Sequence, residues 1–123
     1  MTISQTDFQT RSFAFACLIL KLSRSLDDER TVPSYLTRQV LRSGTSIGAN
    51  LEEARAAQSR RDLISKFSIA LKEARETLYW LRLIQSTCKI PAAILAPASK
   101  EANELVAILT ASVRRLKQKK AKT

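Results

Sequence analysis

The feature that most constrains the fold is a recurrence of apolar residues at alternating spacings of four and three. The first such stripe is Phe8, Ser12, Phe15, Ile19, Leu22 and Leu26. This spacing places the residues on one face of an α-helix about five turns long. Thr6 or Asp7 can cap this helix, and Pro33 marks a surface turn beyond it. The sequence therefore predicts a first helix over about residues 7–27.

The segment of residues 42–62, RSGTSIGANLEEARAAQSRRD, admits two interpretations. Its two glycines among Ser and Thr suggest a loop that holds a phosphate group. Such a loop requires the pattern GxxxxGK[ST] after a strand, and this segment has neither the lysine nor a preceding strand pattern. Positions 36, 40, 44, 47, 51, 54 and 58 instead fall within an arc of about 80° on a helix. We therefore expect a second helix over residues 34–58, with Gly44 where a neighbouring helix can come close.

Two further helices follow from the same periodicity. Ser59 and Asp62 have the spacing of a capping box, which predicts a third helix over about residues 60–88. Its expected inner face is Leu63, Phe67, Ala70, Ala74, Leu78, Leu81 and Gln85. A fourth helix over about residues 92–118 has the stripe Ala98, Ala102, Leu105, Leu109, Ser112 and Leu116. Pro97, close to its start, is expected to bend or restart it.

Four amphipathic segments joined by short links predict an all-α fold, an antiparallel up-down four-helix bundle. A chain of 123 residues fits a single domain, and its two Gly and three Pro residues agree with a helix-rich protein. No stretch reaches the roughly 18 apolar residues of a membrane span, and no secretory signal is visible. We therefore expect a cytoplasmic protein that does not interact with membranes.

The chain is strongly basic, with 21 Lys and Arg against 11 Asp and Glu and a net charge of +10. An anionic partner is one explanation and solubility is another. The candidate nucleic-acid contacts are Arg114, Arg115, Lys117, Lys119 and Lys120 in and before a basic tail of residues 117–123, and Arg38, Arg42, Arg60, Arg61 and Lys66. Cations also complement a helix C-terminus, but six basic residues in the nine from 114 to 122 exceed that need. Binding should be driven by the nucleic-acid backbone and be sensitive to salt.

Some helix faces that should meet water are not charged. The candidate oligomer contacts are Ile69, Trp80 and Leu83 on the third segment and the small residues Thr45, Ala49 and Ala56 on the second. Because these two faces differ, a head-to-tail contact can close into a homo-oligomeric ring. A scattered surface tryptophan is the plainer alternative.

Little in the sequence supports an enzyme. The chain has no His, which removes His-based acid–base catalysis, Ser-His or Cys-His nucleophiles and His-ligated metals. Cys17 and Cys88 match no metal spacing and are expected to be buried thiols. Asn50 lies at the edge of the second stripe, where a buried amide that fixes helix register is favoured over a ligand. We expect no catalytic residue, cofactor or metal.

The segment SGTSIGANLEEARAAQSRRDLISKFSIALKEARETLYWL resembles the four-helix-bundle family of proteins encoded within intervening sequences of bacterial 23S rRNA genes. Ser46, Asn50 and Glu53 are similar to the family pattern S-x-x-x-N-[IL]-x-E, and Phe67–Leu71 is similar to its F-L-S-I-A-L-type segment. The Gly that the family usually has after this Glu is Ala54 here. A Pro that commonly precedes the Asn is replaced in SIGAN.

The resemblance implies a bacterial helical bundle, often a homopentamer, whose biochemical role is largely undetermined. It also brings in a relative, the accessory protein of diversity-generating retroelements, a basic ring that works with a reverse transcriptase and its RNA. Two hypotheses follow. The chain is either a non-enzymatic oligomer that binds RNA or DNA through its basic surface and tail, or a protein-interaction scaffold that uses an outer apolar face and whose charge serves solubility.

Overall fold

A computed structural model describes residues 5–28 and 31–122 of the chain, and these residues form four helices. The helices are α1 (Gln5–Asp28), α2 (Ser34–Ala54), α3 (Arg60–Thr87) and α4 (Ala92–Lys122). No strand occurs in these two described ranges. The predicted all-α fold with four helices is confirmed.

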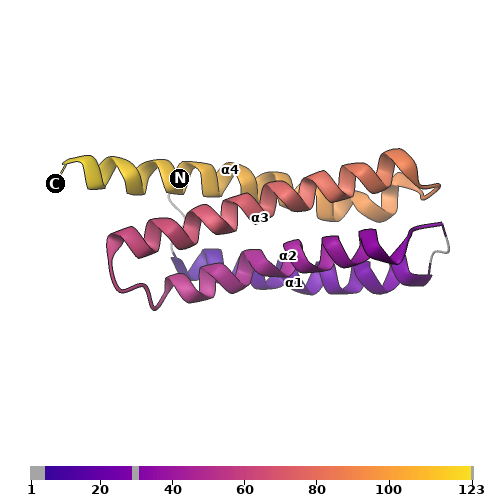
Figure 1. Cartoon of the computed structure of the whole chain (residues 1–123), viewed down its shortest axis with the longest axis horizontal. Coiled ribbons are helices and arrows are strands. Elements are labelled where there is room, and N and C mark those ends of the chain that lie inside the picture. The colour runs from indigo at the N-terminus through magenta and orange to yellow at the C-terminus, as the bar shows by residue number, and fades with distance from the viewer. Residues whose placement is uncertain (1–4, 29–30, 123) are drawn as a thin grey trace.

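The helices lie side by side along the long axis of the molecule, and the chain reverses direction at each connection (Figure 1). Within the described ranges, α1 packs along α2 and α4, and α3 packs along the same two helices, whereas α1 and α3 are diagonal and meet through core side chains such as the rings of Phe8 and Phe67, whose centroids are 5.5 Å apart. The start of α3 and the end of α4 therefore lie at the same end of the molecule, and α4 projects past α3 there.

The apolar stripes of the sequence form the core. All six residues of the α1 stripe are buried, and so are Leu36, Val40, Gly44, Ile47, Leu51 and Ala54 of α2. The α4 stripe is buried from Ala98 to Ser112. The packing of these faces supplies most of the stability of such a fold, because helices in proteins are stabilised mainly by burial of an amphipathic face rather than by intrinsic propensity.

The buried face of α3 consists partly of other residues than those predicted. Gln85 is exposed, and Leu63 and Leu78 are only half-buried, whereas Thr77 and Ile84 are buried. Burial of Thr77 is tolerated because its hydroxyl is satisfied, with its Oγ1 2.8 Å from the Glu73 carbonyl oxygen and 3.0 Å from Ser43 Oγ.

The glycine-containing segment is helical, as the periodicity predicts, and its two glycines face α1. A Cβ atom at position 44 would lie 2.7 Å from Cγ1 of Ile19, and one at position 48 would lie 3.3 Å from the backbone oxygen of Ser12. The absence of side chains at these two positions therefore allows α1 and α2 to approach closely.

The second helix is shorter than expected, because it ends at Ala54 rather than at 58. The amides of residues 55, 56 and 57 each bond to a carbonyl three residues earlier, which tightens the chain into a turn. Ala56, expected on the outer arc of α2, therefore lies in this turn, where it is exposed. Ser59 then adopts an extended backbone as the cap of α3.

The fourth helix continues through Pro97 without restarting, and it ends at Lys122 rather than near 118. Pro97 is the sixth residue of α4, close enough to the helix start that it interrupts little of the hydrogen-bond ladder. The expectation of a restarted helix is therefore wrong.

Ion pairs join α1 to α4. Arg11 binds both carboxylate oxygens of Glu101, with its Nε 2.7 Å from Oε2 and its Nη2 3.0 Å from Oε1, and it also pairs with Glu104. The hydrogen bond from Arg11 lowers the pKa of Glu101 below its ordinary value, and the carboxylates raise the pKa of Arg11.

The two cysteines are free thiols. Cys88 is half-buried, but Cys17 is exposed, so the expectation of a buried thiol is wrong for Cys17. The reason is its register, since Cys17 lies two residues from both Phe15 and Ile19 of the buried α1 stripe and therefore faces outward.

Candidate nucleic-acid interface

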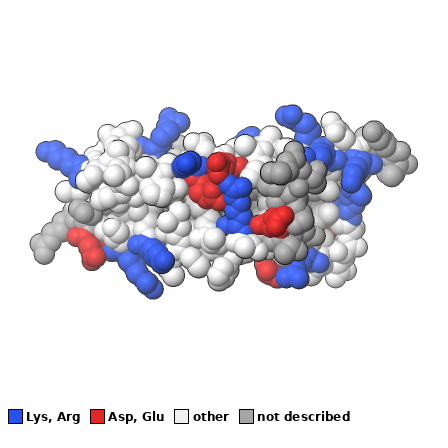
Figure 2. Space-filling view, turned by 180° about the vertical axis from the view of Figure 1, so that it is seen from behind, with Lys and Arg blue, Asp and Glu red and all other residues white. Residues whose placement is uncertain are grey.

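Six of the predicted cations lie at the end of the molecule where α3 begins and α4 ends (Figure 1). They are Arg60, Arg61, Arg114, Arg115, Lys117 and Lys119, and all six are exposed. We call this surface the basic end. Lys120 belongs to the same part of α4, and its side chain lies outside what the structure describes. In Figure 2 several Lys and Arg side chains gather at the right, the end at which α4 terminates.

The cations of the basic end have no acidic partners. Among the side chains that the structure describes, those of residues 7–28 and 31–119, the ion pairs given by the structure engage Arg11, Arg42, Arg55 and Lys66, and no acidic side chain pairs with the six. Arg115 Nη2 lies 3.5 Å from Ser112 Oγ, a long contact that leaves its charge unneutralised. These side chains can therefore contact phosphate groups without first breaking an ion pair.

The first turn of α3 is set by its cap. The backbone amide of Asp62 donates to Ser59 Oγ at 3.0 Å, and the Asp62 carboxylate accepts from the amide of Gln58 at 3.3 Å. This reciprocal arrangement agrees with the predicted capping box, with the amide before the cap as the second donor. It fixes the backbone from which Arg60 and Arg61 extend.

Two predicted phosphate contacts are instead used between helices. Arg42 of α2 pairs with Glu73, at 3.3 Å, and with Glu76 of α3. Lys66 of α3 lies 2.8 Å from the Glu53 carboxylate of α2, and this hydrogen bond raises the pKa of Lys66. The two pairs join α2 to α3. We therefore do not count them among the cations available to a polyanion.

Arg38 is exposed but lies far from the basic end. It is in the second turn of α2, at the opposite end of the molecule, with its Nη1 3.4 Å from Ser34 Oγ. The structure thus brings together six of the ten predicted contacts. Of the other three whose side chains it describes, Arg42 and Lys66 are held in ion pairs and Arg38 lies at the opposite end.

The family-motif residues have local partners. Asn50 Nδ2 donates to the carbonyl of Ser46 at 2.8 Å, and Ser46 Oγ donates to the carbonyl of Arg42 at 2.6 Å, all within α2. Asn50 is half-buried rather than buried, and its hydrogen bond to Ser46 stays within α2, so this bond does not link helices as expected. Glu53 is the partner of Lys66 described above.

The predicted oligomer contacts are only partly exposed. Ala49 and Ile69 are exposed and Thr45 is half-buried, whereas Trp80 and Leu83 are half-buried and pack against the core. The indole of Trp80 also donates to Glu76 at 2.9 Å. The large apolar side chains that are most exposed are others: Phe13 at 71%, Tyr35 at 60% and Tyr79 at 55%.

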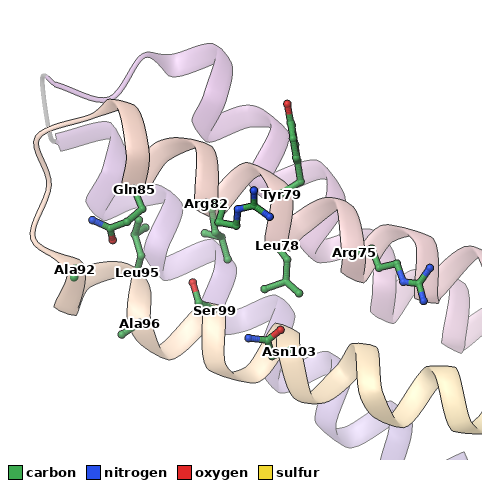
Figure 3. A pocket seen from close by; sticks show the side chains of 11 residues that line it. Arg75, Leu78, Tyr79, Arg82, Gln85, Ala92, Leu95, Ala96, Ser99 and Asn103 are labelled. Atoms are coloured by element: carbon green, nitrogen blue, oxygen red, sulfur yellow. The ribbon is translucent and has the colours of Figure 1, made fainter.

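Two of these aromatic residues, Phe13 and Tyr79, each line a groove. One of about 310 Å³ lies between α1 and α2 beside Phe13, with Ala16, Gly48 and Ala49 in its lining. The other, about 570 Å³, lies between α3 and α4 (Figure 3). Its apolar floor is formed by Leu78, Leu81 and Leu95, and its other lining residues include Arg75, Tyr79, Arg82, Gln85, Ser99 and Asn103.

The α3–α4 groove residues were not singled out from the sequence. Arg75, Tyr79 and Arg82 are spaced by four and three, the signature of one helix side, and that pattern could have identified them. Figure 3 shows Leu78 pointing into the space between the helices and Ser99 and Asn103 pointing toward α3, while Tyr79 rises from the outer side of α3.

Two other kinds of site are absent from the described ranges. No group of three His, Cys, Asp or Glu side chains there is placed to hold a metal ion. None of the four helices, over their described residues, has the length and apolarity needed to span a membrane.

Comparison with known proteins identifies relatives of the whole bundle. Residues 4–111 match the sequence model of a family described as 23S rRNA-intervening sequence protein. A crystal structure of a protein of unknown function from the S23 ribosomal protein family of Bacteroides thetaiotaomicron is similar, with a TM-score of 0.83 and 38% sequence identity. The match covers 91% of this chain and 99% of that one. No curated protein matches the chain.

Proposed function

Because this chain belongs to the 23S rRNA-intervening sequence protein family, we propose that it is a non-enzymatic accessory protein that binds RNA or another nucleic acid. Binding is through the basic end, and the up-down bundle acts as a homo-oligomer. The observation that carries the proposal is the gathering of six exposed cations without acidic partners at one end of the described chain.

Phosphate is the partner chemistry that suits this surface. Arg114, Arg115, Lys117 and Lys119 project from the last turns of α4, where they are exposed beyond the core. Their mutual repulsion is unfavourable in the free protein, and a polyanion relieves it and releases its own counterions. Since no side chain arrangement here reads base edges, the basic end binds the backbone with little sequence preference.

The test is a titration of the protein against a duplex RNA at several salt concentrations. If about six phosphates are neutralised, a plot of log affinity against log salt concentration has a slope near −5, by analogy with duplex DNA. In the variant Arg114→Gln/Arg115→Gln/Lys117→Gln/Lys119→Gln, four contacts are lost, so the slope becomes shallower by about 3 to 4.

A charge-matched control separates location from net charge. Lys21, Arg24, Lys89 and Lys100 are exposed cations in the half of the bundle away from the basic end. Changing these four to Gln lowers the net charge equally but should leave the slope nearly unchanged. Equal losses in both variants would refute the basic end as the binding surface, and no binding by the wild type at low salt would refute nucleic-acid binding altogether.

Self-association is the second part of the proposal. Phe13 and Leu20 are exposed on α1, and Ile69 is exposed on α3. The helices α1 and α3 are diagonal in the bundle, so these two apolar surfaces face in different directions. Unlike surfaces on opposite sides suit a head-to-tail contact, which closes into a ring when the rotation between copies allows it.

A protein-interaction scaffold is the competing function, and the exposed Phe13 beside the α1–α2 groove favours it. In that case the groove binds an apolar side chain of another protein and the charge only keeps the protein in solution. The salt titration distinguishes the two functions, because a scaffold shows little affinity for RNA at any salt concentration.

A further inference from the structure

The groove between α3 and α4 carries a stripe of one aromatic and two basic side chains. Arg75, Tyr79 and Arg82 are all exposed. Arg75 and Arg82 are seven residues apart on α3, which places them about 10.5 Å apart along the helix axis, with Tyr79 between them. All three side chains extend from α3, and Tyr79 rises from the side of α3 that faces away from α4 (Figure 3).

The two guanidinium groups have no acidic partner in the described part of the chain. The acid next to Arg75 in sequence, Glu76, instead pairs with Arg42 and accepts a hydrogen bond from Trp80. The α3 side of the groove therefore presents two uncompensated cations, separated by more than one helical turn. This arrangement suits a ligand with negative charges at intervals along its length.

The rest of the groove is not charged. Leu78, Leu81 and Leu95 give it an apolar floor, and Ser99 and Asn103 of α4 point toward α3 with hydroxyl and amide groups that can donate or accept hydrogen bonds (Figure 3). A volume of about 570 Å³ is in the range of sites for small organic ligands. The ligand therefore has flat or apolar parts between its charges.

Tyr79 supplies an aromatic surface at the edge of this groove. Its ring meets that of Trp80 edge-on, with centroids 5.2 Å apart and planes at 74°, so Trp80 supports the Tyr79 ring on one side. More than half of Tyr79 nevertheless remains exposed, at 55%. An exposed, braced aromatic ring beside cations is the combination on which nucleic-acid bases stack.

We propose that the α3–α4 groove binds an unpaired, single-stranded segment of nucleic acid. Arg75 and Arg82 contact its phosphates, and a base stacks on the outward-facing ring of Tyr79 at the edge of the groove. A duplex does not fit this description, because its bases are stacked within the helix and are not free to reach Tyr79. The inference rests on the proposed function, since it assigns a second site to the same partner.

The test compares a fluorescently labelled oligouridylate with a labelled duplex RNA by anisotropy. Tyr79→Ala should weaken binding of the oligouridylate by about fivefold or more, the effect expected for loss of one stacked base. Tyr79→Phe, which keeps the ring, should bind as the wild type does. Arg75→Gln/Arg82→Gln should also weaken oligouridylate binding, and neither groove variant should change duplex binding more than a control.

The matched control is Lys21→Gln/Arg24→Gln, which removes two exposed cations from α1. If Arg75→Gln/Arg82→Gln loses no more affinity for the oligouridylate than this control, or if Tyr79→Ala binds normally, the groove is not the site. Displacement of the oligouridylate by a polyglutamate of equal charge as effectively as by unlabelled oligouridylate would also overturn the proposal, since the groove would then accept any polyanion.

Failure of this inference differs from failure of the proposed function. If the wild type binds neither RNA at low salt, nucleic-acid binding itself is refuted. If it binds both and the basic-end variant weakens both, while the groove variants behave as the control does, only the groove assignment is refuted. Arg75, Tyr79 and Arg82 are exposed, so replacing them should leave the helical content measured by circular dichroism unchanged in every variant.

Discussion

At the scale of single residues, Gly44 sets how closely α1 and α2 approach. Its missing side chain leaves room for Ile19, which is fully buried, and Gly48 four residues later allows the backbone of α1 to come near. In an interior position of a helix each glycine costs about 1 kcal/mol relative to alanine. That cost is offset by the contact of two helix surfaces at short range.

Gly44→Ala should destabilise the protein despite its better helix propensity. The new Cβ would lie 2.7 Å from Cγ1 and 2.9 Å from Cγ2 of Ile19, and neither atom is the free end of a flexible chain. Overpacking of this kind costs about 1–3 kcal/mol, so a net loss of up to about 2 kcal/mol is expected. Urea denaturation measures it as a lower midpoint with an unchanged slope.

The double variant Gly44→Ala/Ile19→Ala is the control, because it removes both of the crowding atoms. It should be less destabilised than the sum of the two single variants. Additive losses would mean that the crowding of Ile19 is not the cause. Gly48→Ala, with a closest contact of 3.3 Å to a backbone oxygen, is expected to have the smaller effect of the two glycine variants.

Burial of side chains was predicted correctly from the sequence where the helical period of apolar residues alone determines which residues face the core. The α1 stripe and Gly44 are buried as expected, because one helix face faces the core throughout. The prediction failed where a residue on another helix determines the surroundings of a side chain. Thr77 is buried beside Ser43 of α2, and Arg42 and Lys66 are paired with acidic residues across the α2–α3 contact. Spacing along one helix does not reveal which residues of the next helix lie opposite.

At the scale of elements, the start of α3 is the best-defined boundary. Ser59 Oγ accepts from the amide of Asp62, and the Asp62 carboxylate accepts from the amide of Gln58. Local sequence was sufficient to predict this cap. The end of α2 was not predictable in the same way, because the apolar period continues past Ala54 while the chain must turn in time for Ser59 to be extended.

Ser59→Ala should lower the free energy of unfolding by about 1 kcal/mol, since the amide of Asp62 loses its acceptor. Ser65→Ala is the matched control, because Ser65 is exposed within α3 and alanine has the higher helix propensity. Thermal unfolding followed by circular dichroism compares the two. A Ser59→Ala variant as stable as the wild type would show that the cap adds nothing to stability.

The contact of α1 with α4 should make stability depend on pH. Binding by Arg11 lowers the pKa of Glu101 in the folded state below the ordinary value of 4.5. The stabilisation is therefore present above about pH 4.5 and is lost as the pH falls through the folded-state pKa. Because both side chains are partly exposed, its size is at most about 1 kcal/mol.

In Glu101→Gln this part of the pH dependence should be absent. The comparison requires unfolding midpoints in urea from pH 3 to pH 7 for both proteins, since the difference between them should shrink toward the acidic end. A difference that stays constant over this range would mean that the charge of Glu101 does not contribute.

At the scale of the whole molecule, apolar side chains are exposed on two diagonal helices, which is the basis of the proposed assembly. Trp80 is a poor probe of it, because the residue packs partly against the core. Phe13 is a better probe, since it is 71% exposed and its replacement leaves the core intact.

Phe13→Glu should reduce the molar mass in solution toward that of the 13.8 kDa chain if α1 forms a contact between copies. A buried carboxylate without a partner opposes association. Tyr35→Glu is the control, as Tyr35 is similarly exposed but lies in the first turn of α2. Static light scattering measures both, and an unchanged mass for Phe13→Glu would exclude this part of α1 from any interface.

The closure of the bundle through α1 and α4 has a consequence for how the chain folds. The other extensive helix contacts, α1 with α2, α2 with α3 and α3 with α4, join neighbours in sequence, whereas Arg11 and Glu101 are 90 residues apart. Such a low contact order is typical of chains that fold in microseconds to milliseconds. We expect the α1–α4 ion pairs, whose partners are far apart in sequence, to form after the rate-limiting step. Breaking them should then accelerate unfolding and leave the folding rate nearly unaltered.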